Sequence, residues 1–511
     1  MTNRRFIWSS LGKIVYGSLI TATFCLAVYS ELPADTSATH QPVETAGDAS
    51  AKSLYSRPNI VLILADDMGY GDIAAYNQSS KIPTPNLDSL AESGMRFTDA
   101  HSPSAVCTPT RYGLLTGRYA WRSALKRGVL WGHSPLLIET GRETIASMLK
   151  RVGYTTAAIG KWHLGIGNNE ANYYGRLAPG PNSVGFDYFY GIPASLDMEP
   201  YVYVENEQLD TPLEGRIIKA SGNRREGGDG FWRSGQIGTG FSHQEVLPVL
   251  ADKATEYIRQ HGEDSNQEPF FLYFALPSPH TPWLPAEEYR GVSGAGYYGD
   301  FAAQVDGVVG RVVKALEESG LATNTLLVYT SDNGAHWLDT DIEQFGHRAN
   351  GTLRGQKADI YEGGHRVPLM VIWPGKVSGG TVSQQPVVLT DLMATFASIT
   401  GAEAGEHAAP DSVDFSPVLL SEDDARIQRL SMVHHSMNGM FAIRAGNWKL
   451  IEGLGSGGFT KPSRIEATGQ EMPYQLYDLV NDLAEKDNVA GGHPEVVKAL
   501  LAELNRIRDS E

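Results

Sequence analysis

Chemically competent side chains follow four separate apolar runs in the sequence. Each run is short and continuously apolar, as expected of a strand that is covered on both faces. The runs occupy residues 60–65, 156–159, 270–276 and 326–329. The side chains that follow them are Asp66 and Asp67, Lys161 and His163, His280, and Asp332 and Asn333. Because ligands bind outside the carboxyl ends of parallel strands in open α/β sheets, we expect these groups to meet at one sheet edge.

Cys107 is a further reactive residue, and it begins the run Cys-Thr-Pro-Thr-Arg. Pro109 suits the first turn of a helix, where its missing amide proton has no helical partner. Cys107 is therefore expected at a helix N-terminus, where free amides and the helix dipole favour an anion. Arg111 follows one turn later, close enough to share that anion. A structural cysteine that caps an ordinary helix would also explain this run taken alone.

Lys161 and His163 are separated by one residue. In an extended chain, side chains two positions apart lie on the same side, so we expect both to face the same way. A lone histidine after a strand, as at position 280, is more often structural than catalytic. Its context, Ser-Pro-His-Thr-Pro, favours a functional role for His280.

Amphipathic segments between the apolar runs predict the helices that hold these strands in place. Residues 249–260 and 301–318 have apolar positions at helical spacing. Strands that alternate with such helices predict an α/β fold with a large, mostly parallel sheet sandwiched by helices, in an order that the sequence leaves open.

The C-terminal part of the chain has a different pattern. Residues 401–414 are rich in Ala, Glu and Pro and look like a connection. Residues 440–443 and 448–451 predict a hairpin, 474–479 a further strand and 494–507 a helix. We therefore expect a catalytic domain over 58–398 and a smaller α+β subdomain over 399–511.

The N-terminal residues indicate export. Arg4, Arg5 and Lys13 precede an apolar run over 14–29, which is typical of a signal peptide over 1–30. An uncleaved membrane anchor is the alternative. Residues 31–57 read as a flexible leader. We expect a periplasmic or extracellular protein without stable membrane association after cleavage.

The composition limits the possible functions. The 511 residues have a net charge of -17, which argues against a nucleic-acid partner because phosphate backbones select basic surfaces. The apolar fraction of 41% is that of an ordinary globular protein. Of the two cysteines, Cys25 lies in the signal segment, so the mature chain keeps only Cys107 and forms no internal disulfide.

Taken together, the motifs resemble the type I, formylglycine-dependent sulfatases, an arylsulfatase-like family that includes exported bacterial polysaccharide sulfatases. Residues 107–118 match its signature, Cys-x-Pro-x-Arg continuing into Leu-Thr-Gly-Arg. The other similar blocks are 59–72, 153–165, 279–283, 331–334, 353–368 and 475–488. The resemblance covers nearly the whole chain after the leader and implies an alkaline-phosphatase/sulfatase-like fold.

This resemblance implies that a formylglycine-generating maturation enzyme converts Cys107 to formylglycine (3-oxoalanine), an aldehyde that is hydrated at rest. One hydroxyl of the hydrate attacks sulfur and displaces the alcohol. Loss of a proton from the second hydroxyl then expels sulfate and restores the aldehyde.

The resemblance also implies a role for each site residue. One calcium ion, with magnesium as the alternative, is held by Asp66, Asp67, Cys107 (as formylglycine), Asp332 and Asn333. His163 is the base and Lys161 holds the hydrate or a sulfate oxygen. His280 and Lys357 bind sulfate, and His280 is our candidate for the general acid. Arg111, Lys161 and Lys357 form a cationic cluster that suits a sulfuryl transition state.

Several alternatives stay open at this level. A phosphatase or phosphonate monoester hydrolase would present similar groups, and a non-enzymatic binder of sulfated glycans would share the scaffold. The expected substrate is a sulfated polysaccharide or oligosaccharide, with simple aryl sulfates as the alternative. Residues 168–245 are expected to choose between them. Trp283, His336 and Trp337 flank the motifs and either stack on a leaving group or, more commonly, pack as the wall of the pocket.

Overall fold

The structure, a computed structural model, describes residues 57–219, 231–264, 268–405, 407–421, 426–469 and 472–510. The expected signal peptide, 1–30, and the expected leader up to residue 56 lie outside these residues. Among the residues that the structure describes, no helix is both long and apolar enough to cross a membrane.

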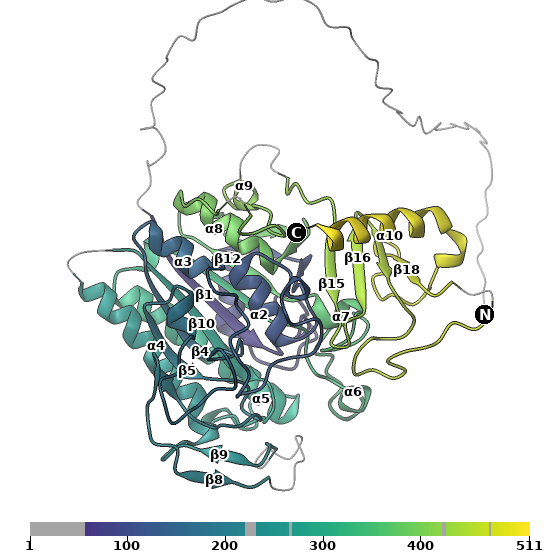
Figure 1. The fold of residues 1–511 in the computed structure, drawn as a ribbon. Coiled ribbons are helices and arrows are strands. Elements are labelled where there is room, and N and C mark those ends of the chain that lie inside the picture. Colours follow the sequence, from purple (N-terminus) through teal and green to yellow (C-terminus); the bar gives the residue numbers. More distant parts are fainter. Residues whose placement is uncertain are drawn as a thin grey trace, which may run out of the picture. The chain divides into compact units, whose positions relative to one another are not determined.

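A ten-stranded sheet forms the centre of the fold (Figure 1), in the order β13-β2-β12-β11-β1-β10-β4-β5-β6-β7. Its five middle strands are parallel neighbours: β11 (Thr325–Ser331), β1 (Asn59–Asp66), β10 (Phe270–Pro279), β4 (Thr155–Lys161) and β5 (Tyr188–Ile192). The flanking strands are β12 (Leu369–Ile372), β2 (Met95–Phe97), β13 (Thr381–Ser383), β6 (Val204–Glu205) and β7 (Gln208–Leu209). Antiparallel pairs occur only between flanking strands or where β12 and β6 join the parallel block. The expected mostly parallel sheet is thus confirmed.

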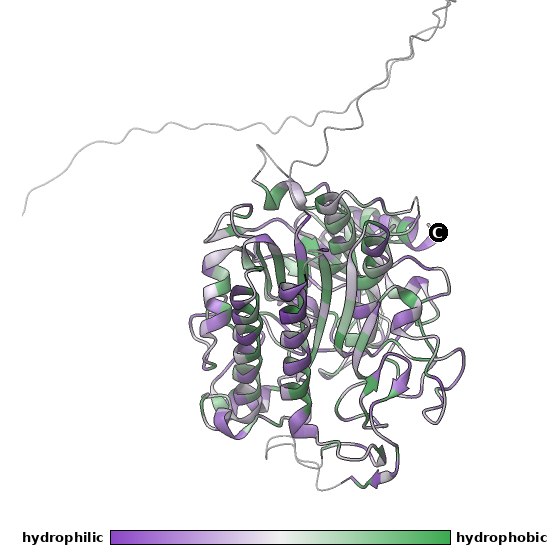
Figure 2. Cartoon of the chain, turned by 90° about the vertical axis from the view of Figure 1, so that its left-hand side faces the viewer, coloured by the Kyte–Doolittle hydropathy of each residue, from purple (hydrophilic) through white to green (hydrophobic). Residues whose placement is uncertain are grey.

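Helices cover both faces of the sheet. Ile60, Leu62 and Leu64 of β1 pack in one core, and Val61 and Ile63 pack in the other. The first core includes α2 (Cys107–Thr116), α3 (Ile145–Arg151) and α8 (Leu392–Thr400). The second includes α1 (Pro85–Ser93), α4 (Val246–Glu263) and α5 (Gly296–Glu318). Figure 2 shows the strands mainly in the green of hydrophobic residues, which explains why their sequences read as continuous apolar runs.

The C-terminal residues form a second, four-stranded antiparallel sheet. It contains β15 (Met432–His435), β16 (Phe441–Ala445), β17 (Trp448–Ile451) and β18 (Gln475–Asp478), with α10 (Pro494–Asp509) packed on it. The smaller subdomain expected from the sequence is confirmed. Phe415 and Leu419, in and next to α9 (Ser416–Leu419), still pack in the first core of the large sheet. The residues directly after 399 therefore belong structurally with the large sheet.

The remaining elements are short. They are β3 (Ala100–His101), β8 (Gly215–Ile217), β9 (Gly235–Ile237), β14 (Val387–Val388), α6 (Asp339–Phe345) and α7 (Glu362–His365).

Candidate active site

The carboxyl ends of four parallel strands bring the predicted side chains together. Asp66 is the last residue of β1 and Lys161 the last residue of β4. His280 directly follows β10, and Asp332 directly follows β11. All four are buried. The expected convergence at one sheet edge therefore occurs in the folded chain.

The loop after β1 is held tightly in place. Asp67 has a φ of 67°, a left-handed conformation that turns the chain back over the sheet edge. Gly69 lies so close to a neighbouring segment that a Cβ there would meet the carbonyl oxygen of Ala349 at 2.1 Å. The Met68 amide donates to Ser331 Oγ at 3.0 Å, which ties the loop to the end of β11.

Asp72 anchors the same loop from behind, and it was not singled out as a site residue from the sequence. Its carboxylate accepts hydrogen bonds from the Gly69 amide at 2.7 Å and from the Tyr298 hydroxyl, and lies 2.8 Å from His347 Nε2. These partners are distant in the sequence, so only the fold reveals that Asp72 positions Asp66 and Asp67.

Cys107 is the first residue of α2, as expected from Pro109. It is free and buried, with 2% of its surface exposed. Burial raises the pKa of its thiol, although the nearby cations Lys161 and Lys357 act in the opposite direction. Gly117 ends the helix in a left-handed conformation with a φ of 61°.

Arg111 connects α2 to the acidic residues rather than facing an anion at the helix start. Its Nε and Nη2 atoms donate to Asp332 Oδ2 at 3.1 and 2.8 Å, and Nη1 donates to the Lys161 carbonyl at 2.9 Å. Burial alone would lower the pKa of Arg111, but Asp332 and its neighbours raise it overall. The guanidinium therefore stays charged inside the protein.

Two lysines pair with the two acidic residues after β1. Lys161 Nζ donates to Asp66 Oδ2 at 2.6 Å, and Lys357 Nζ donates to Asp67 at 2.7 Å. Burial opposes the ionised form of Asp66, but Lys161 and the other nearby cations lower its pKa well below the ordinary range. His280 Nε2 lies 3.8 Å from Asp67 Oδ2. Five of the predicted side chains thus form two ion-paired groups, which meet at the adjacent residues Asp66 and Asp67.

The expected extended conformation is confirmed for Lys161 but is wrong for His163. Strand β4 ends at Lys161, and His163 has a left-handed φ of 56°. The imidazole Nε2 lies 2.8 Å from the Leu130 carbonyl oxygen, to which it donates, while Nδ1 is buried without a hydrogen-bond partner among the described residues. Burial, together with Lys161 and Arg111, lowers the pKa of His163 well below its ordinary value. His163 is therefore a neutral base with a free lone pair.

The oxygen donors at this edge fit a hard metal ion. Asp66 Oδ1 and Asn333 Oδ1 are buried and have no hydrogen-bond partner among the described residues. Ligand atoms of Asp66, Cys107 and Asp332 lie within 4.8 Å of one another. Burial and the charge of Asp66 raise the pKa of Asp332, although Arg111 and Lys161 act in the opposite direction. Carboxylate and amide oxygens without nitrogen ligands suit calcium or magnesium.

The flanking aromatic residues form a wall. Trp283 and Trp337 are 3% and 4% exposed, and both rings pack against Tyr298. His336 lies beside Phe459 with ring centroids 5.0 Å apart. The packing role expected for the two tryptophans is confirmed.

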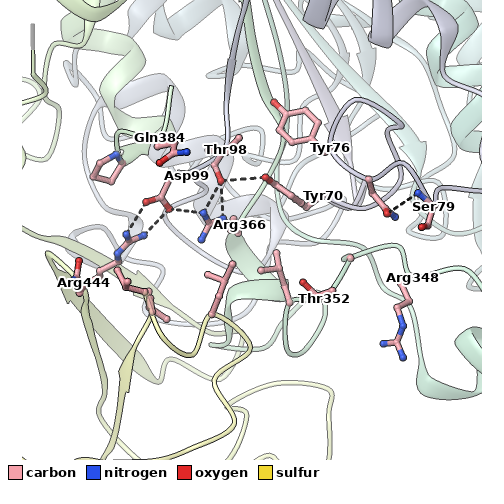
Figure 3. A pocket seen from close by; sticks show the side chains of 18 of the residues that line it. Tyr70, Tyr76, Ser79, Thr98, Asp99, Arg348, Thr352, Arg366, Gln384 and Arg444 are labelled. Carbon is pink, nitrogen blue, oxygen red and sulfur yellow. Dashed lines mark hydrogen bonds and ion pairs between the residues drawn. The ribbon is translucent and has the colours of Figure 1, made fainter. Parts of the chain in front are cut away.

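A large cavity lies apart from these residues (Figure 3). It has a volume of about 960 Å³, and none of the predicted site residues lines it. Asp99 is paired with both Arg366 and Arg444, and the Tyr70 hydroxyl donates to the Thr98 carbonyl at 3.3 Å. These polar groups of the lining therefore already have protein partners.

Comparisons with known proteins agree with this geometry. The family model described as Sulfatase matches residues 58–402. The chain is 35% identical to the N-acetylgalactosamine-6-O-sulfatase of Bacteroides thetaiotaomicron, over 88% of this chain and 93% of that protein. It is 34% identical to human arylsulfatase A, over 87% and 86% of the two chains.

A solved structure from a study of glycosaminoglycan metabolism by Bacteroides thetaiotaomicron is also similar. Its TM-score is 0.79, with 35% identity, and the match covers 89% of this chain and 100% of that chain. Family model, relatives and fold agree, so the chain belongs to the sulfatase family.

Proposed function

We propose that this sulfatase is exported to the periplasm or the cell exterior and removes sulfate from a sulfated polysaccharide or oligosaccharide. The observation that best supports hydrolysis of the sulfate ester is the position of Cys107. It lies at a helix start beside Lys161 and Lys357, and buried carboxylates lie close to it. Fixed cations around a nucleophile position suit the charge that develops on a sulfuryl group.

We propose that a maturation enzyme converts Cys107 to formylglycine. The hydrated aldehyde supplies one hydroxyl as the nucleophile and a second as the route for releasing sulfate. The run from Cys107 to Arg111 and its position at the start of α2 support this proposal.

We assign a calcium ion, with magnesium as the alternative, to the oxygens that lack partners. The proposed ligands are Asp66, Asp67, Asp332, Asn333 and residue 107. A bound ion supplies positive charge that offsets the charge of the sulfate and lowers the pKa of a bound hydroxyl. Arg111 orients Asp332 for this role through its two hydrogen bonds.

The proton-transfer roles follow from the hydrogen bonds of the histidines. His163 donates from Nε2 to Leu130, so its free Nδ1 is the atom that accepts a proton during sulfate release. His280 Nδ1 donates to the Thr281 carbonyl oxygen at 2.6 Å, so in the neutral ring Nε2 carries a lone pair. Once Nε2 takes up a proton, the imidazolium can pass that proton from Nε2 to the departing alcohol. Lys161 and Lys357 hold sulfate oxygens as fixed cations.

The relatives support a carbohydrate substrate. One acts on N-acetylgalactosamine 6-sulfate by its name, and the similar solved structure comes from work on glycosaminoglycans. Simple aryl sulfates stay the alternative substrate, because the chain is also similar to human arylsulfatase A.

Sulfate release from a panel of esters tests the proposal. The panel contains sulfated glycan oligosaccharides, galactosamine sulfates, an aryl sulfate, and the matching aryl phosphate and phosphonate. The chain is coexpressed with a formylglycine-generating enzyme, oxidation of Cys107 is checked by peptide mass, and a Cys107→Ala variant is the control. We expect release from a sulfated glycan that the variant loses by more than about 10³-fold.

Two results would contradict the proposal. Faster turnover of the phosphate or phosphonate would favour the rival hydrolase activity. Glycan binding without release, by a chain whose Cys107 is fully oxidised, would favour a non-enzymatic binder.

A further inference from the structure

An exposed loop lies directly beside the candidate active site. The Leu130 carbonyl accepts the hydrogen bond from His163, and the Leu130 amide donates to Thr108 Oγ1 at 3.1 Å, one residue from Cys107. The next residue, Trp131, is therefore fixed at the rim of the site by backbone contacts with its base and its nucleophile position.

Trp131 differs from the other tryptophans of the described chain. Its exposed fraction is 52%, and among the described residues it is the only tryptophan that is more than half exposed. Trp162, Trp283 and Trp337 are at most 4% exposed. An exposed indole close to a buried site offers a large, rigid apolar surface to a ligand.

Arg233 holds the indole ring from one side. Its guanidinium carbon lies 4.7 Å from the ring centre of Trp131, a cation–π distance. Arg233 Nη1 donates to the Asp197 carbonyl at 3.0 Å and to Asp197 Oδ2 at 2.5 Å. Because 52% of Trp131 is exposed, the ring surface that Arg233 does not cover stays available to a ligand.

Arg233 also keeps donors of its own. Its side chain is 46% exposed, and its Nε and Nη2 atoms have no hydrogen-bond partner among the described residues. Two parallel N–H donors match a carboxylate or a sulfate in geometry and charge. The pair thus offers an apolar ring and an anion-binding fork a few ångströms apart.

The backbone around Trp131 is packed from two sides. A Cβ at Gly132 would meet the Glu199 carbonyl oxygen at 2.2 Å, and the Tyr173 hydroxyl donates to the Gly132 carbonyl. His133 Nε2 lies 3.5 Å from Glu199 Oε2. The loop is therefore held in one position, which lowers the entropy lost when a ligand binds.

We propose that Trp131 and Arg233 bind the sugar residue next to the sulfated one, and that this neighbouring sugar carries a carboxylate or a second sulfate. The indole contacts the C–H face of the sugar ring, and Arg233 pairs with the anion. This inference rests on the proposed carbohydrate sulfatase function and adds that the preferred substrate is a polyanionic oligosaccharide. A simple aryl sulfate has neither the neighbouring sugar nor the second anionic group.

Steady-state kinetics on two substrates tests this assignment. For Trp131→Ala and for Arg233→Met, kcat/KM is measured on a uronic-acid-containing sulfated tetrasaccharide and on an aryl sulfate. We expect the ratio of the two values to fall about 10-fold in each variant, mainly through KM on the tetrasaccharide. Arg176→Met is the matched control, because Arg176 is an exposed arginine paired with Glu207 and should leave the ratio unchanged.

Binding to a catalytically inactive chain separates this inference from the proposed function. Calorimetry measures the Kd of the same tetrasaccharide for Cys107→Ala alone and combined with Trp131→Ala or Arg233→Met. A Kd raised about 10-fold supports the site even if no ester is turned over. An unchanged Kd and an unchanged kinetic ratio would overturn it, as would an equal loss on both substrates, which would show that the loop only supports His163.

Discussion

Two clusters of buried charge differ in how their side chains are connected. The catalytic cluster, built from the predicted site residues after β1, β4, β10 and β11, leaves Asp66 Oδ1, Asn333 Oδ1 and His163 Nδ1 without partners among the described residues. A second cluster lies where α7 meets the C-terminal sheet. We call it the junction cluster and define it as Asp99, His101, Glu362, His365, His434, Arg444, Lys449 and Glu485.

The junction cluster is linked by a chain of hydrogen bonds. Lys449 Nζ lies 3.0 Å from His365 Nε2, His365 Nδ1 lies 3.1 Å from His101 Nδ1, and His101 Nε2 lies 2.8 Å from Asp99 Oδ1. Since an ammonium group only donates, His365 carries its proton on Nδ1 and His101 carries its proton on Nε2. Lys449 thus fixes the tautomer of His365, and His365 fixes the tautomer of His101.

Lys449 closes the other end of this chain. Its Nζ lies 3.0 Å from Glu362 Oε1 and 2.8 Å from Glu485 Oε1. His101, His365 and His434 are close enough to hold a metal ion, but the His365 and His434 rings are stacked at 4.0 Å and 11°. Nitrogen lone pairs in nearly parallel planes do not meet at one ion. His434 Nε2 also has no hydrogen-bond partner among the described residues, so both clusters contain unpaired atoms. The junction cluster joins two sheets through its linked charges, whereas the unpaired atoms of the catalytic cluster lie at the proposed metal and sulfate site.

The largest expected difference between the clusters is in activity. His163→Gln keeps a donor for the Leu130 carbonyl but removes the base, so sulfate release should fall about 10²–10⁴-fold with little change in unfolding free energy. His365→Gln is the matched change in the junction cluster and should lower stability while kcat stays near the wild-type value. An equal loss of kcat in both variants would break the comparison.

The second prediction concerns stability. Lys449→Met leaves Glu362 and Glu485 buried without their cation, so the unfolding free energy should fall by about 3–5 kcal/mol. Urea denaturation followed by circular dichroism measures the change. Lys498→Met, at an exposed position of α10, is the control. If Lys449→Met unfolds at the same urea concentration as the wild-type protein, the junction cluster does not hold the sheets together.

The third prediction concerns the metal. Calcium at about 100 times its Kd should raise the unfolding free energy of the chelator-treated protein by about 2.7 kcal/mol. Asp332→Asn should lose most of this gain, and Asp339→Asn, at an exposed position of α6, should keep it. Thermal denaturation with and without calcium gives the answer independently of activity. Equal gains in all three proteins would place the ion outside the catalytic cluster.

The smallest effect is a dependence of stability on pH. Burial lowers the pKa of His101, His365 and His434 below the ordinary value of 6.5. Below pH 6.5 the unfolded chain binds protons that the folded chain does not, so stability falls as the pH drops towards the lowered pKa values. The loss should reach at most about 1.4 kcal/mol per pH unit for each histidine.

Urea midpoints at pH 7.5 and 5.5 measure this slope. His434→Phe keeps a ring stacked on His365 and removes one titrating group, so the slope should become shallower. The same slope in both proteins would assign the pH dependence to other groups.

The amino-acid sequence by itself determined the parallel strands and the start of α2, and it predicted the candidate site residues that the fold brings together. Short, continuous apolar runs such as β1 are typical of strands covered on both faces, and Pro109 marks the first turn of a helix. These patterns are local in the sequence, so they can be recognised without knowledge of the fold. The spacing of catalytic motifs likewise depends on the chain alone.

Only the tertiary structure decided how the side chains are paired. It turned His163 into a left-handed conformation, directed Arg111 to Asp332, and placed the exposed Trp131 and Arg233 together. It also built the junction cluster, none of which was expected from the sequence. Such contacts join residues that are tens to hundreds of positions apart, and no local pattern encodes them because their energy arises only after the sheets pack.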